Sequence, residues 1–191
     1  QGYATVDAKG SGSAAGIGGG GNGGNAENII IRGHSNVTAT SCDGAAIGGG
    51  SSFSHHSSGS ATGIWIYGHA TVNASTSGNG AAIGAADGNR YAEAEVTIGT
   101  DGATAEQEDV HVTATSKDGA AIGNGNANTK VIIQGHTTIE NAFSKYGTAI
   151  GGNYYANDSG DMSITIRDNA TIKKAEVSDE AANLGKRPAI K

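Results

Sequence analysis

Three histidines that could bind a metal or exchange protons occupy equivalent places in the chain. His34, His69 and His136 each directly follow a glycine, and Thr100 follows the corresponding glycine between the last two. Imidazole binds transition metals and titrates near neutral pH, so stacked histidines could share an ion or a proton. Duplication of a sequence, however, also copies residues that have no chemical role. We expect an inherited column of histidines, interrupted at Thr100, with metal binding as the alternative.

Two other groups of side chains could carry chemistry, and we expect both to lie in solvated loops. Glu106, Glu108 and Asp109 form the densest acidic cluster, and paired carboxylates serve as acid and base in glycoside hydrolysis. Neighbouring acids in an exposed loop lack the burial that would separate their pKa values. His55 and His56 could ligate a metal, but adjacent side chains of an extended segment point to opposite sides. The sequence therefore predicts no catalytic residue, no metal site and no cofactor.

Aromatic residues close to amides and carboxylates favour contact with a sugar, because sugar rings stack on aromatic faces while polar groups bind the hydroxyls. One candidate platform is a predicted strand with two aromatic residues on its outer face, and the other is a loop. The candidate ligand-binding residues are Trp65, Tyr67, Asn153, Tyr154, Tyr155, Asn157 and Asp158. The partner that these residues predict is a host or environmental glycan or surface protein.

The glycine-rich run at 18–24, broken only by Asn22, has spacing typical of loops that bind dinucleotides. A dinucleotide fingerprint needs a strand before it and a helix after it, and no helical pattern follows this run. Calcium-binding nonapeptide repeats need aspartates at a fixed register, which the run lacks. We expect a loop without a ligand.

These residues are positioned by one repeated unit, built around the heptad GAAIGGG at 44–50. Near-copies recur at 14–20, 80–86, 119–125 and 147–153, and their isoleucines are spaced by 28 to 39 residues. A repeat period in this range is typical of a solenoid. The architecture is therefore easier to predict than the function.

A short segment of alternating apolar and polar residues precedes each heptad, as at 36–39, and another follows it. A period of two is typical of half-buried strands. Three short strands per coil predict an all-β parallel β-helix (β-solenoid) of about five full coils, each of which buries its apolar residues against its neighbours. The predicted core consists of Ile29, Ile31, Val37, Ile47, Ile64, Ile66, Val72, Ile83, Val96, Ile98, Val112, Ile122, Val131, Ile133, Ile139, Ile150, Ile164 and Ile166.

The same alternation predicts which side chains face outward. In the strand after the heptad, Trp65 would lie on the outer face with Ile30 and Ile132 of other coils. Such an apolar stripe either marks a contact surface or is covered by another segment.

The strand before each heptad places one residue of each coil in an outward-facing column, and this column is informative about polysaccharide cleavage and ice binding. It reads Asp7, Thr38, Asn73, Thr113 and Glu140, and no acidic pair recurs on it, as a β-helix lyase or glycosidase would need. Threonine pairs two residues apart, which suit the flat face of an ice-binding solenoid, occur in only two coils. We therefore predict no enzyme activity, with an ice-binding solenoid or a fragment of a polysaccharide-degrading enzyme as alternatives.

The composition of this chain of 191 residues limits the classes of partner that it could bind. Its net charge is −6, with lysine and arginine spread along the sequence, which predicts no nucleic-acid partner. No run of about 18 apolar residues occurs, so we expect no membrane insertion. A single cysteine, Cys42, excludes an internal disulfide. We expect residues 1–191 to form a single parallel β-helix domain excised from a longer chain, with 176–191 as a C-terminal cap or tail.

By its heptads and its Ile-x-Ile-x-Gly and Val-x-Ala segments, the chain over about residues 1–175 resembles the Gly-Ala-Gly-Ile-Gly-Gly-Gly repeat stretches of large bacterial cell-surface proteins. It departs from their pattern at Asn141, where other coils carry alanine, and at Ala85 and Ala86, which replace heptad glycines. The resemblance implies right-handed parallel β-helices, secretion or cell-surface display, and adhesin-like or carbohydrate-associated roles. No catalytic residue carries over, because the repeat is structural.

From the residues and the resemblance together, we expect a segment of an extracellular bacterial surface protein. It would act as an adhesin stalk or cell-surface contact module without catalysis. A carbohydrate-binding module that uses exposed aromatic residues is the alternative.

Overall fold

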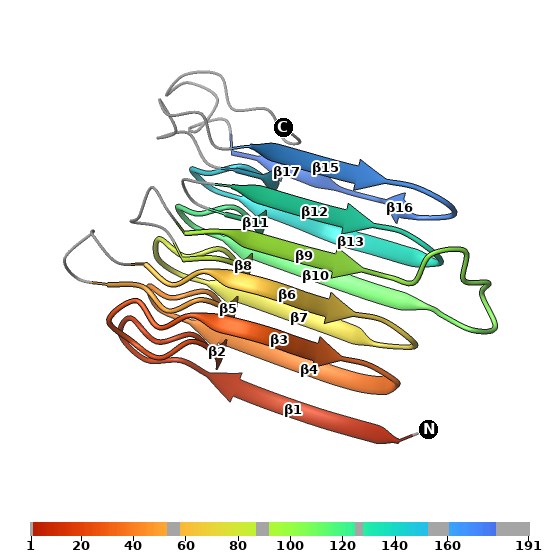
Figure 1. Ribbon diagram of the computed structural model, residues 1–191, viewed down its shortest axis with the longest axis horizontal. Helices are drawn as coiled ribbons and strands as arrows, with labels where there is room; N and C mark the ends of the chain where they lie inside the picture. Colours follow the sequence, from red (N-terminus) through yellow and green to blue (C-terminus); the bar gives the residue numbers. More distant parts are fainter. Residues whose placement is uncertain (1, 53–57, 87–91, 125–127, 153–160, 179–191) are drawn as a thin grey trace.

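Short parallel strands in the computed structural model alternate among three sheets, which we name A, B and C (Figure 1). Sheet A contains β1 (Tyr3–Lys9), β4 (His34–Ser41), β7 (Thr71–Thr76), β10 (Val110–Ser116), β13 (Thr137–Ser144), β16 (Thr171–Ile172) and β17 (Ala175–Val177). Sheet B contains β2 (Ile17–Gly18), β5 (Ile47–Gly48), β8 (Ile83–Gly84), β11 (Ile122–Gly123) and β14 (Ile150–Gly151). Sheet C contains β3 (Ala26–Ile31), β6 (Ala61–Ile66), β9 (Ala94–Ile98), β12 (Thr129–Ile133) and β15 (Met162–Ile166).

The structure describes residues 2–52, 58–86, 92–124, 128–152 and 161–178. Within these ranges no residue is helical, and so no helix there could cross a membrane.

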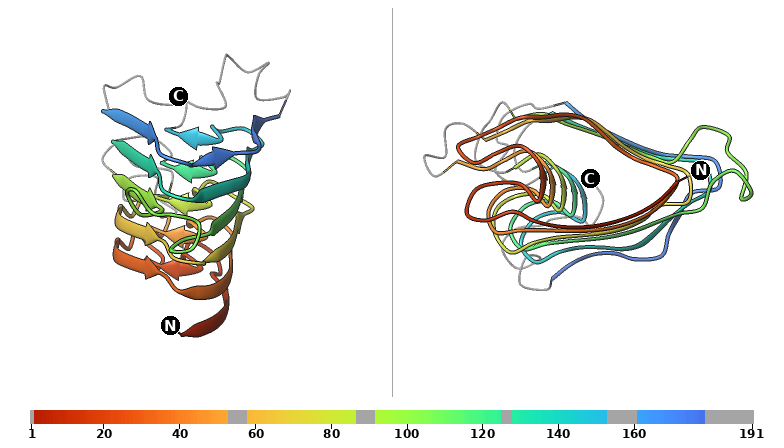
Figure 2. Two further views of the ribbon diagram at one scale, coloured as in Figure 1. Left: turned by 90° about the vertical axis from the view of Figure 1, so that its right-hand side faces the viewer. Right: turned by 90° about the horizontal axis from the view of Figure 1, so that it is seen from below.

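Each strand pairs in parallel with the equivalent strand one coil away, so equivalent residues stack in columns. Val6, Val37, Val72 and Val112 are successive partners in sheet A. Sheets A and C form the two broad faces of a flattened coil, and sheet B closes one end of its cross-section (Figure 2). Seen from the N-terminal end, the chain turns clockwise as it recedes, which is the right-handed sense. The predicted parallel β-helix, with three strands per coil and about five coils, is confirmed.

The heptads form sheet B because their glycines let neighbouring coils approach closely. The glycine after each isoleucine has a positive φ, which is +138° at Gly48 and +136° at Gly84. A Cβ atom on Gly84 would lie 1.8 Å from the carbonyl oxygen of Gly123 in the next coil. No side chain fits at that distance, so stacking itself requires glycine at this place in the heptad.

The three sheets enclose a core of isoleucine, valine and alanine, and most of the predicted core residues are buried in it. The exceptions lie at the two ends of the stack. Ile29 and Ile164 are half-buried against the core, and Ile166 is 42% exposed, so the prediction was wrong for Ile166. Ile166 belongs to β15, and no further described strand of sheet C covers that strand.

A β-bulge in β13 corrects two interpretations of the sequence. The register shifts where Glu140 is an extra residue, so that Thr113 pairs with Asn141. Ala142 therefore stacks on Ala114, and the apparent loss of alanine at Asn141 is a one-residue insertion. A bulge absorbs such an insertion without turning the rest of the strand inside out. The outward column of sheet A consequently continues with Asn141 and not with the predicted Glu140.

Candidate ligand-binding surfaces

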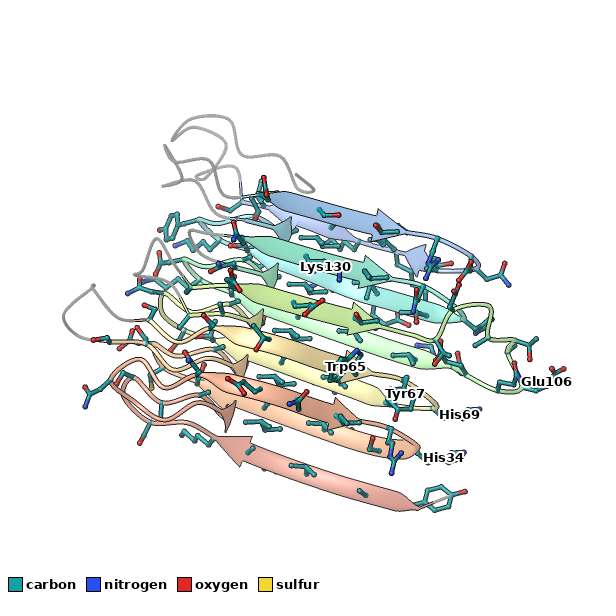
Figure 3. All side chains as sticks on the ribbon, viewed as in Figure 1. His34, Trp65, Tyr67, His69, Glu106 and Lys130 are labelled. Carbon is teal, nitrogen blue, oxygen red and sulfur yellow. The ribbon has the colours of Figure 1, made fainter. Side chains whose placement is uncertain are left out.

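Trp65 lies on the outer face of sheet C, where the alternating pattern predicts it (Figure 3). It is 37% exposed, and its partner in the preceding coil, Ile30, is 53% exposed. On its other side Trp65 pairs with Thr97, which in turn pairs with Ile132. Because Thr97 interrupts the predicted stripe, its continuous apolar part consists of Ile30 and Trp65.

The indole of Trp65 covers a second β-bulge. The register between β6 and β9 shifts between Ala61 and Ile64, and Gly63 within this bulge has a φ of +75°. A Cβ atom on Gly63 would lie 2.9 Å from Cη2 of Trp65 and 3.4 Å from the side-chain oxygen of Asn28. The ring thus rests on bare backbone, which fixes its orientation while leaving part of it exposed. An aromatic side chain fixed in this way loses little conformational freedom when it binds a ligand.

Tyr67 lies two residues after Trp65, where the chain leaves sheet C (Figure 3). Its hydroxyl oxygen accepts a hydrogen bond from Nη1 of Arg32 at 3.5 Å. Together with Gly68 and residues of an insertion at 100–108, Tyr67 lines a pocket of about 380 Å³. The two predicted aromatic residues are therefore close in the chain but serve different surfaces, one flat and one concave.

The insertion at 100–108 projects beyond the other coils between β9 and β10 (Figure 1). Glu108 at its end is only 1% exposed, and its carboxylate accepts hydrogen bonds from the backbone N–H of Thr100 at 2.9 Å and of Gly68 at 3.4 Å. Glu106 is exposed, as expected of a solvated loop (Figure 3). The prediction of a solvated acidic cluster was therefore wrong for Glu108, which is a buried anchor.

A second carboxylate holds the insertion from the opposite side. Oδ2 of Asp168, in the last described coil, accepts hydrogen bonds from the backbone N–H of Gly102 and of Gly135, both at 3.2 Å. These backbone hydrogen bonds lower the pKa of Asp168. The walls of the Tyr67 pocket are thus fixed by groups from three coils.

The predicted histidine column forms, with one correction. The rings of His34 and His69 stack with centroids 4.6 Å apart and planes 5° from parallel. The next residue of the column is Asp109, whose N–H donates to the carbonyl of Gly68 and whose Oδ1 lies 3.4 Å from Nδ1 of His136. The interruption at Thr100 was therefore a wrong prediction, because the insertion carries Thr100 out of the column.

Sequence reasoning missed an ionic network beside this column. Nδ1 of His111 lies 2.8 Å from Oε1 of Glu140, and its Nε2 lies 3.2 Å from Oδ1 of Asp109. Lys173 Nζ contacts both oxygens of Glu140, at 2.9 Å and 2.8 Å. The hydrogen bond to Glu140 is the main cause that raises the pKa of His111, whereas Lys173 and then His111 lower the pKa of Glu140. The strand pattern places Glu140 beside Thr113, whereas the bulge leaves Glu140 without a partner in β10 and within reach of His111, so the pattern alone could not reveal the network.

A shallow groove on the outer side of sheet C was also missed. Its lining includes Ala94, Thr129 and Met162, and the other residues that line it are polar. The rim residues come from three successive coils: Glu93, Glu95, Asn128, Lys130, Asp161 and Ser163. The only sequence signal is that each coil carries polar residues just before or within its sheet C strand.

Contacts between coils fix the rim of this groove. Nδ2 of Asn128 donates to Oε1 of Glu93 at 3.2 Å, and Oδ1 of Asn128 accepts from the N–H of Asp161 at 3.0 Å. Nζ of Lys130 lies 2.7 Å from Oε1 of Glu95. The rim thus presents three carboxylates and one ammonium group, which suits hydroxyl donors and disfavours anions.

The other predicted ligand-binding residues lie outside the residues that the structure describes: Asn153, Tyr154, Tyr155, Asn157 and Asp158. The same is true of His55 and His56. Among the side chains that are described, no group of three or more His, Cys, Asp or Glu is placed to hold a metal ion.

Among the described residues, the surfaces that contain or adjoin the predicted aromatic residues are the Trp65 face, the groove beside it and the Tyr67 pocket. The first two share the outer side of sheet C, because Thr62 of β6 also lines the groove. Comparisons with family models, curated proteins and solved structures give no match to this chain.

Proposed function

We propose that this chain is a segment of an extracellular bacterial surface protein, secreted or displayed on the cell, that acts without catalysis as an adhesin stalk and contact module. The resemblance of its heptads to surface-protein repeats supports the location. The stack supports the role of stalk, because parallel pairing within three sheets joins the described coils to their neighbours. A rod of this kind holds a contact surface at a fixed distance and orientation.

The contact surface that we propose is the outer side of sheet C, and its ligand is a glycan. One observation carries this proposal: an exposed tryptophan held against backbone lies on the same face as a groove rimmed by carboxylates and an amide. The indole offers a flat apolar face for a sugar ring, and Glu93, Asn128 and Asp161 offer partners for its hydroxyl groups. Because the rim carries more negative than positive charge, a neutral or amino sugar suits it better than an acidic one.

A glycan array probed with the whole chain, followed by titration of any glycan that binds, tests this proposal. We expect selective binding of neutral or amino glycans. Trp65→Ala should weaken it about tenfold, a loss of about 1.4 kcal/mol that corresponds to one aromatic stacking contact. Asn128→Ala should also weaken binding, because it removes the amide of the rim. The carboxylate of Glu93 and the N–H of Asp161 would then lose the partner that holds them in place.

Tyr3→Ala is the matched control, since Tyr3 is an aromatic residue that is 83% exposed but belongs to sheet A. It should leave glycan binding unchanged. Binding that survives both Trp65→Ala and Asn128→Ala would exclude sheet C as the contact surface. If no glycan bound at all, the chain would be a spacer only.

A further inference from the structure

The outer face of sheet A carries two uncharged columns that lie apart from the contact surface proposed on sheet C. Thr38, Asn73 and Thr113 are successive partners in one column, and Thr40, Ser75 and Thr115 are successive partners in the next. We call these six residues the hydroxyl–amide grid. We propose that the grid is a second binding face, independent of sheet C, which takes an uncharged, hydroxyl-rich polysaccharide laid across the coils.

The polar groups of the grid are free to bind. All six residues are exposed or half-buried, and within the described parts of the chain none of their side chains hydrogen-bonds to another protein group. A hydroxyl group both donates and accepts, and the amide of Asn73 adds two donors and an acceptor. Parallel pairing repeats these groups about every 4.8 Å between coils and about every 6.6 Å along a strand. The grid therefore offers a regular, two-dimensional set of partners to a polymer of hydroxyl groups.

Charged residues surround the grid but do not enter it. Asp7 and Lys9 lie in the coil before it, and Glu140 pairs with Lys173 beyond it. An uncharged face would have to strip water from a charged ligand without offering it a counterion, which is costly. The hydroxyl groups of a neutral glycan, in contrast, exchange hydrogen bonds with water for equivalent hydrogen bonds with the grid.

The next coil extends the grid in a manner that suits a sugar. Because of the bulge at Glu140, Asn141 continues the first column and half-buried Phe143 continues the second. Phe143 adds an aromatic ring on which a sugar unit could stack. An ice surface would need the same side chain at every place, and Asn73, Ser75 and Phe143 break that regularity. The grid therefore favours a glycan over ordered water.

Sedimentation of the whole chain with insoluble cellulose and with insoluble chitin tests this inference, and soluble polygalacturonate serves as the acidic comparison. We expect binding to at least one of the neutral polymers and none to polygalacturonate. Because the grid is uncharged, the dissociation constant should change less than about twofold between about 0.1 M and about 1 M salt. The triple variant T38A/N73A/T113A should weaken binding by at least about tenfold, since it removes three hydrogen-bonding side chains from exposed positions.

Two further variants keep the test decisive. Asn73→Lys changes one exposed side chain and should abolish binding while the circular dichroism spectrum stays that of the unchanged chain. Glu106→Gln, at an exposed position of the insertion and away from both sheets, should leave binding to the neutral polymers unchanged. Loss of binding with Trp65→Ala but not with the triple variant would overturn the grid and favour the sheet C contact. Binding of neither neutral polymer, preferential binding of polygalacturonate, or thermal hysteresis in freezing solutions would also overturn it.

Discussion

Single residues in this protein act across coils, because parallel stacking brings residues about 35 positions apart into contact. The network of His111 shows the consequence, since its partner Glu140 is 29 positions away and Lys173 lies 33 positions beyond that. The pKa of His111 is raised in the folded state, and this shift stabilises the fold. The stabilisation is fully present below the unfolded pKa of 6.5 and is lost as pH rises through the folded pKa. A folded-state pKa that is lowered, as for Glu140, adds stability that is present above 4.5 and is lost as pH falls through the folded pKa.

The ion pair of His111 and Glu140 should therefore stabilise the fold most in mildly acidic solution. We predict that Glu140→Gln lowers the midpoint of thermal unfolding more at about pH 5.5 than at about pH 8, because a larger fraction of His111 is protonated at the lower pH. Glu95→Gln is the matched control, since Glu95 also pairs with a lysine of the next coil but contacts no histidine among the described residues. Its effect should be similar at the two pH values. Equal pH dependence in both variants would contradict the role of His111.

At the scale of elements, the coils tolerate extra residues on their outer side but not in the heptad. Bulges at Gly63 and at Glu140 and the insertion at 100–108 each leave the flanking residues in register. In sheet B, by contrast, backbone meets backbone. A Cβ atom on Gly48, Gly84 or Gly123 would lie within 2.1 Å of a carbonyl oxygen of the next coil. The spacing of the heptads is therefore variable, whereas their glycines are not.

This difference predicts the effect of two glycine substitutions. Gly84→Ala should destabilise the chain by more than about 3 kcal/mol or prevent folding, because the backbone of two coils would have to move apart and φ is +136° there. Gly20→Ala is the control, since a Cβ atom on Gly20 meets nothing within 4 Å. Its free energy of unfolding, measured with urea, should change by no more than about 0.5 kcal/mol. Equal effects would show that close approach in sheet B does not limit stability.

At the scale of the whole molecule, stability comes from contacts between neighbouring coils. Every pairing in the three sheets joins a coil to the one before or after it. In such a stack the free energy of folding is close to a sum of terms for each coil and each interface between coils. Loss of one entire coil should therefore shorten the rod without changing its construction.

Deletion of residues 94–128 tests this view, because Thr129 pairs directly with Ala94 and would take its place after Glu93. We predict that the shortened chain remains folded, with the circular dichroism spectrum of a β protein and a lower midpoint of thermal unfolding. Deletion of 94–109 is the control, since it removes a sheet C strand and leaves its sheet A and sheet B partners in place. That chain should fail to fold. A folded product from the second deletion, or an unfolded one from the first, would contradict the additive stack.

The sequence by itself determined the architecture of this protein. Period-two segments and a recurring heptad can bury their apolar residues only by stacking, and glycine at fixed places allows the coils to approach. These local patterns predict that Trp65 faces outward and that the core residues between Val37 and Ile150 face inward. They also predict that His34 and His69 are neighbours in the stack. Such properties depend on the spacing of residues within one coil.

Only the tertiary structure decided which residues of different coils meet. Glu108 looked like one of three solvated acids, but the path of the insertion buries it against Gly68. Glu140 looked like a member of the outward column of sheet A, but a bulge replaces it there with Asn141. Register between coils is fixed by where each extra residue is absorbed, and hydrogen bonds of the whole stack determine that place. For this reason the groove, the ionic network and the hydroxyl–amide grid emerge only when the coils are assembled.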